Sequence, residues 1–114
     1  MIGREAIVQI LDQYAKHGWR FRRVLLSEQF REQIPETADI FEGVEIKSSA
    51  LNGLWFSRSS RPGITAWELR HLSTTPYALV ENIADSAGDA DVELMLKRVE
   101  AKMIEVLRRP KPGH

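Results

Sequence analysis

Two amphipathic helical patterns enclose a series of short alternating segments, and this order constrains the fold more than any other feature of the chain. Between Arg4 and Lys16, apolar residues recur at spacings of three and four and form one stripe, and Gly18 follows as a typical helix-ending glycine. Ala90 to Arg108 repeats the pattern over a longer stretch. Each helix must bury its stripe against another layer, so we expect an α/β fold with a small central mixed sheet flanked by helices.

The segments between the two helices predict short strands. Four of them are rich in β-branched and aromatic residues: Trp19–Leu26, Val44–Lys47, Leu54–Phe56 and Tyr77–Ile83. Ile64 to Leu72 is ambiguous, because it alternates like a strand while Thr65-Ala66-Trp67-Glu68 has the pattern of a helix capping box. Its composition favours a helix, so we predict a helix there, with a strand as the alternative.

The length of 114 residues suits one domain with one core, which we place at residues 1–109. Residues 110–114, with two prolines and a glycine, are expected to form a flexible tail. The lack of cysteine excludes disulfides, thiolate metal sites and cysteine nucleophiles, and it suits a reducing, cytoplasmic location. No apolar run is long enough to cross a membrane, so no membrane partner is expected.

The residues that could carry chemistry lie in the centre of the chain. Glu45 and Lys47 are two positions apart and point to the same face of the predicted strand. Asp39 precedes them across the turn signal Glu42-Gly43, and the two segments could pair as a hairpin. A two-residue turn would direct Asp39 away from Glu45. A three-residue turn would put Asp39, Glu45 and Lys47 on one face, and the sequence leaves both registers open.

The second register would have a clear chemical use. Asp39 and Glu45 would bind a hard divalent cation, magnesium or manganese, which prefers oxygen ligands and keeps water molecules for a substrate phosphate. The cation would stabilise charge at the phosphorus centre, and Lys47 would orient or deprotonate the attacking water.

At these residues the chain resembles the restriction-endonuclease-like, PD-(D/E)xK, nuclease superfamily, whose core is α-β-β-β-α-β. Glu45-Ile46-Lys47 matches its acid-x-lysine motif, and Asp39 matches its upstream acid. Glu5 lies where Holliday-junction-resolvase-like members carry a further acid on the first helix. The resemblance implies magnesium-dependent hydrolysis of DNA, with catalytic residues Asp39, Glu45, Lys47 and Glu5, of which Asp39 and Glu45 would be the metal ligands.

The resemblance covers about residues 3–83 and is incomplete. Ala38 stands where the family often has proline, and the gap between Asp39 and Glu45 is short. Pro35-Glu36 offers an alternative upstream acid in a predicted loop. In this comparison Ile64–Leu72 would be the helix of the core, and the C-terminal helix lies outside it.

Basic residues suggest how such a domain would hold its substrate. Arg20 and Arg22 share a face of the first predicted strand, and Arg58 and Arg61 lie in a predicted polar loop, so we expect all four to contact phosphates of DNA. Nucleases that cut both strands commonly dimerise, which makes a homodimer an expectation as well.

Two other classes of function remain open. In a non-catalytic α+β interaction or dimerisation module, Ile64–Leu72 would be a strand of an antiparallel meander with two helices on one face. An open sheet face bearing Trp and Arg would then bind the partner. In an inactive nuclease fold, the domain would bind nucleic acid without cutting it. A helix at Ile64–Leu72 favours the nuclease topology, and a strand favours the module.

Overall fold

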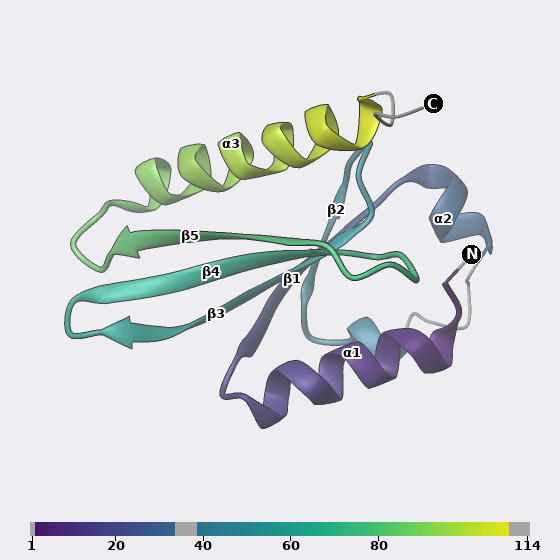
Figure 1. Ribbon diagram of the computed structural model, residues 1–114, viewed down its shortest axis with the longest axis horizontal. Helices are drawn as coiled ribbons and strands as arrows, with labels where there is room; N and C mark the ends of the chain where they lie inside the picture. Colours follow the sequence, from purple (N-terminus) through teal and green to yellow (C-terminus); the bar gives the residue numbers. More distant parts are fainter. Residues whose placement is uncertain (1, 34–38, 110–114) are drawn as a thin grey trace.

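The computed structural model describes residues 2–33 and 39–109, and within these ranges five strands form one mixed sheet accompanied by three helices (Figure 1). In chain order the elements are α1 Arg4–Lys16, β1 Arg20–Leu26, α2 Glu28–Gln33, β2 Glu45–Ser48, β3 Gly53–Arg61, β4 Ile64–His71, β5 Ala78–Ala84 and α3 Asp89–Arg108. The expected fold class, a small mixed sheet flanked by helices with a C-terminal helix, is confirmed. The tail at 110–114 and the alternative acid in Pro35-Glu36 lie outside the described residues.

The strands follow the order β2-β1-β3-β4-β5 across the sheet. β1 and β2 run parallel, and β1-β3, β3-β4 and β4-β5 are antiparallel. A parallel neighbour needs a crossover connection, and the chain supplies it through α2 and the segment that follows. β2 and β5 are therefore the two edges of the sheet.

The helix predicted for Ile64–Leu72 is wrong, because these residues form β4. β4 pairs with β3 along one side and with β5 along the other, and its alternation sends Trp67 and Leu69 into the core beneath α3. The capping-box pattern is a local preference, and it yields to two full ladders of backbone hydrogen bonds and the burial of alternate side chains. The α-β-β-β-α-β order is consequently replaced by a β3-β4-β5 meander.

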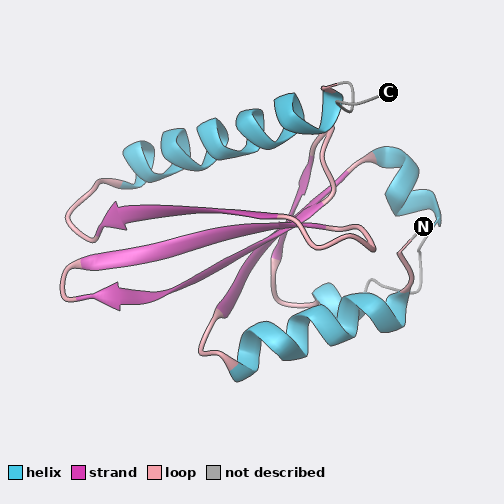
Figure 2. Cartoon of the chain, viewed as in Figure 1, coloured by secondary structure: helices cyan, strands magenta, loops and turns pink. Residues whose placement is uncertain are grey.

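Helices α1 and α3 cover opposite faces of the sheet (Figure 2). Ile7 of α1 packs with Val24 and Phe56 in one core, and Leu96 of α3 packs with Trp55 in the other. The meander alternative, which puts both helices on one face, is thus wrong in that respect, although its strand at 64–72 is correct.

β1 contains a bulge that changes which side chains reach α3. Phe21 pairs with Phe56 and Arg23 with Trp55, so Arg22 is an extra residue in the ladder. The bulge reverses the alternation: Phe21 faces α1, whereas Arg23 faces α3 together with Leu25. Strict alternation from Trp19 would put Arg23 on the α1 side, and the bulge moves it to the α3 side.

Among the described residues, none of the helices combines the length and the apolar character that crossing a membrane requires.

Candidate functional site

The hairpin that would join Asp39 to Glu45 is not formed. Asp39 lies in a single turn of 3-10 helix at residues 39–41, and Gly43 reverses the chain with a positive φ of 81°. β2 then pairs in parallel with β1, and the described residues that directly precede it, 39–44, form no strand. Both registers considered from the sequence are therefore wrong, because residues 39–41 form a helical turn and not the first strand of a hairpin.

Asp39 lies on the side of α1. Its carboxylate accepts two hydrogen bonds from the guanidinium of Arg4, at 2.5 and 2.7 Å, and its side chain is 62% exposed. The hydrogen bonds from Arg4 lower the pKa of Asp39, and the positive charge of Arg4 adds to this. Glu5, the other predicted acid of this region, is an exposed residue in the first turn of α1.

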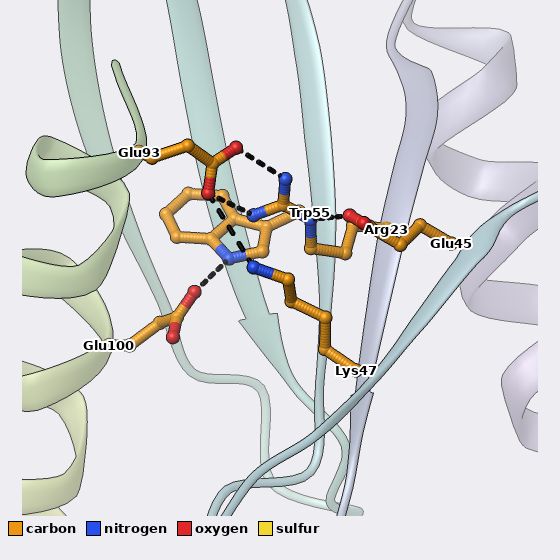
Figure 3. Close-up of polar contacts among 6 residues, drawn as sticks. All are labelled: Arg23, Glu45, Lys47, Trp55, Glu93 and Glu100. Atoms are coloured by element: carbon orange, nitrogen blue, oxygen red, sulfur yellow. Dashed lines mark hydrogen bonds and ion pairs between the residues drawn. The ribbon is translucent and has the colours of Figure 1, made fainter. Parts of the chain in front are cut away.

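Glu45 and Lys47 lie on the opposite side, beneath α3, where they belong to an ionic network around Arg23 (Figure 3). Arg23 Nε donates to Glu45 Oε1 at 2.5 Å, and Arg23 Nη2 donates to Glu93 Oε1 at 2.6 Å. Lys47 Nζ is 3.7 Å from Glu93 Oε2. We call these four residues the Arg23 network. It joins β1 and β2 to the first half of α3.

The Arg23 network is also an electrostatically coupled unit. Burial lowers the pKa of Arg23, but hydrogen bonds to Glu93 and Glu45 outweigh that effect and leave the pKa raised. The hydrogen bond from Arg23 holds the pKa of Glu93 below its ordinary value, and the positive charge of Lys47 contributes further. Every charge in the network thus has a partner of opposite sign.

A second polar contact fastens α3 to the sheet. The fully buried Trp55 donates its indole N–H to Glu100 Oε2 at 2.9 Å (Figure 3). Glu93 and Glu100 are seven residues apart, which places both on the same side of α3. Sequence reasoning missed Arg23, Glu93 and Glu100. The seven-residue spacing of the two acids could have indicated their shared position, but nothing in the sequence revealed the bulge that brings Arg23 to them.

The residues predicted to bind a metal are not brought together. Asp39 bonds to Arg4 on the α1 side of the sheet, whereas Glu45 bonds to Arg23 on the α3 side. Within the described ranges 2–33 and 39–109, no cluster of three or more His, Asp or Glu side chains is placed to hold a metal ion. The predicted ligand pair Asp39 and Glu45 therefore does not fit a shared magnesium ion.

The four arginines predicted to contact phosphates do not form one surface. The guanidinium of Arg22 lies 5.0 Å from the ring centre of Trp67 on the α3 side. Arg20 begins β1, opposite Ser57. Arg58 lies 4.4 Å from the ring centre of Trp19, on the α1 side, and donates to the carbonyl of His17 at 2.8 Å. Arg61 ends β3, next to the turn into β4. The polar loop predicted for Arg58 and Arg61 is therefore wrong, because both residues belong to β3.

A cleft of about 550 Å³ opens beside the Arg23 network, between the start of α3 and the sheet. Its lining includes Arg22, Arg23 and Trp67 together with four carboxylates, those of Glu45, Asp85, Asp89 and Glu93. Asp85 accepts a hydrogen bond from the hydroxyl of Thr65 at 2.6 Å. This mixture of charges offers no uniformly positive surface for a polyanion.

On the opposite face, α1 leaves the outer part of the sheet uncovered. A groove of about 670 Å³ runs there past Trp19, Arg58, Glu68 and Val80. The Tyr14 hydroxyl donates a hydrogen bond to Glu68 at the border of this groove. The pKa of Tyr14 is raised, chiefly by burial and also by this hydrogen bond. The groove is a second candidate for binding, with an aromatic and a mixed-charge lining.

Comparison with protein-family models, with curated proteins and with solved structures gives no match for this chain. Any function assigned to the candidate sites must therefore be argued from their geometry.

Proposed function

We propose that this domain is a non-catalytic interaction module that acts by self-association. The observation that carries this proposal is the mixed sheet with an edge strand at each end, each edge carrying a large exposed apolar residue. Ile46 on β2 is 42% exposed, and Val80 on β5 is 52% exposed. An edge strand offers backbone donors and acceptors to a further strand, and apolar side chains beside it add contact area.

The placement of the charged residues supports the same proposal. Glu45 and Lys47 contribute to the Arg23 network, which joins β2 to α3, and Asp39 pairs with Arg4. To bind a cation, Glu45 would have to give up a hydrogen bond from a nearly buried guanidinium, which has a substantial cost. These residues are better suited to holding elements together than to exchanging ligands.

The direct test is the oligomeric state of the full chain. We expect sedimentation velocity and light scattering to give a dimer whose population falls on dilution, because association follows mass action. A monomer at every concentration tested would contradict the proposal.

A metal-dependent nuclease acting on DNA is the second candidate, favoured by one observation: Glu45, Lys47 and Glu93 lie on one side of the sheet, and Glu45 and Glu93 line a cleft there. Nicking of plasmid DNA with magnesium or manganese would test it, using Glu45→Ala and Lys47→Ala as variants. We expect no cleavage that depends on either residue. Cleavage by the wild type that both variants lose would favour the nuclease.

The third candidate, an inactive nuclease fold that binds nucleic acid, is addressed by the same samples. Binding through phosphate contacts would weaken steeply with added salt and would fall when Arg20 and Arg22 are replaced. Because Arg22 lines a cleft that also contains carboxylates, we expect weak retardation of DNA in gels and little change in the variants.

A further inference from the structure

The free edge of β2 has a defined pattern of backbone groups. In a parallel ladder, alternate residues direct both their N–H and their C=O to the neighbouring strand. Ser49 donates its N–H to the carbonyl of Leu26 on the β1 side at 3.1 Å. Lys47 and Glu45 are two and four residues before Ser49, so they also direct their backbone N–H and C=O groups toward β1. Ile46 and Ser48 consequently direct their backbone groups outward. The exposed Ile46 lies at the middle of this edge.

The two residues that flank Ile46 on this edge carry opposite charges. Glu45 precedes it and Lys47 follows it, and both face α3 while Ile46 faces the other side of the sheet. If two copies paired antiparallel about a twofold axis at Ile46, each Glu45 would lie opposite Lys47 of the second copy. The two Ile46 residues would exchange two backbone hydrogen bonds and bring their side chains together.

We infer that two copies of this chain associate through β2, antiparallel and centred on Ile46, and thereby join their sheets into one continuous sheet. This inference rests on the proposed function and specifies its contact. The charges select the arrangement, because a parallel pairing in register would put Glu45 against Glu45. They also extend the Arg23 network across the axis, since Lys47 would lie between its own Glu93 and Glu45 of the second copy.

The other edge of the sheet suits self-pairing less well. The backbone N–H of Asp85 donates to the carbonyl of Gly63, and the N–H of His71 donates to the carbonyl of Tyr77. Tyr77, Asp85 and the alternate residues between them therefore bond to β4, and Val80 directs its backbone groups outward. Pairing about Val80 would put Leu79 opposite Glu81, an apolar residue against a charge. Pairing about Glu81 would put two like charges together. β5 therefore offers a matched control for each experiment on β2.

The register can be tested by a single disulfide. The chain has no cysteine, so Ile46→Cys introduces the one thiol. In the proposed pair the two Cα atoms would be about 5.5 Å apart, within the range of roughly 4.4–6.8 Å that disulfides span. Under mild oxidation we expect Ile46→Cys to form a covalent dimer and Val80→Cys to remain largely uncrosslinked.

The charge pairing can be tested by mixing two variants. Glu45→Lys alone puts two lysines of one copy against two of the other, and Lys47→Glu alone does the same with acids. We expect each variant to associate at least about tenfold more weakly than the wild type. Mixed together they regain complementarity, and native mass spectrometry should then show mostly heterodimers. Circular dichroism and thermal unfolding of each variant establish that it is folded.

The possible failures of these experiments differ. A wild-type chain that stays monomeric overturns both the proposed function and this inference. If the wild type dimerises but neither charge variant associates more weakly, the β2 contact is overturned and self-association stands. The same conclusion follows if Val80→Cys crosslinks and Ile46→Cys does not.

Discussion

Two arginine–carboxylate sites lie on opposite faces of the sheet, and they use the same chemistry in different settings. On the α3 side, Arg23 bonds to Glu45 and Glu93, and its side chain is 13% exposed. On the α1 side, Arg4 bonds to Asp39, whose side chain is 62% exposed. Each site contains one of the acids that the sequence predicted as a metal ligand.

The difference shows why charge pattern alone is a poor guide to a site. A nearly buried cation must have partners, so Arg23 determines where Glu45 and Glu93 lie. An exposed pair gains little over its separate interactions with water. The Arg23 network should therefore matter for stability, and the Arg4–Asp39 pair should matter little.

Replacing Arg23 should give the largest effect. Arg23→Met keeps much of the side-chain volume but leaves Glu45 and Glu93 without their shared donor. We expect a loss of about 2 kcal/mol in the free energy of unfolding, below the range for fully buried pairs because both acids are partly exposed. Urea unfolding monitored by tryptophan fluorescence measures it.

The control for Arg23→Met is Arg22→Met, one residue earlier in the same bulge. Arg22 contacts the face of Trp67 and is exposed, so its removal should cost less than Arg23→Met. Equal losses for the two variants would contradict the distinction between buried and exposed cations.

Much of the fold follows from the sequence, and the exceptions have physical causes. Periodicity predicts α1, α3 and most strands, because burying one face of an element leaves a regular trace in the chain. β4 was missed because a capping-box pattern outweighed its alternation, and only pairing with β3 and β5 decides between them.

The candidate site was predicted less well, since it depends on long-range geometry. The sequence correctly puts Glu45 and Lys47 on one face of β2. It gives no sign that β2 pairs in parallel with β1, or that a bulge at Arg22 turns Arg23 toward Glu93. These arrangements join segments far apart in the chain.

A smaller effect should appear when acid is used to break the Arg23 network. The pKa of Glu93 is lower in the folded protein than its ordinary value, so the folded state favours its charged form. The associated stability is present above the ordinary pKa and is lost as pH falls through the lowered value. The difference in unfolding free energy between wild type and Glu93→Gln should thus shrink as the pH falls through this range. A difference independent of pH would contradict this assignment.

The smallest effect should come from the Arg4–Asp39 pair. The pKa of Asp39 is also lowered, chiefly by the hydrogen bonds from Arg4, so its contribution likewise disappears with acid. Because the pair is exposed, Asp39→Asn should change the unfolding midpoint by no more than the experimental error at physiological salt, with a small loss emerging at low salt. If Asp39→Asn proved as destabilising as Glu93→Gln, the acid on the α1 side would have a greater structural role than its exposure implies, and burial would not be what separates the two sites.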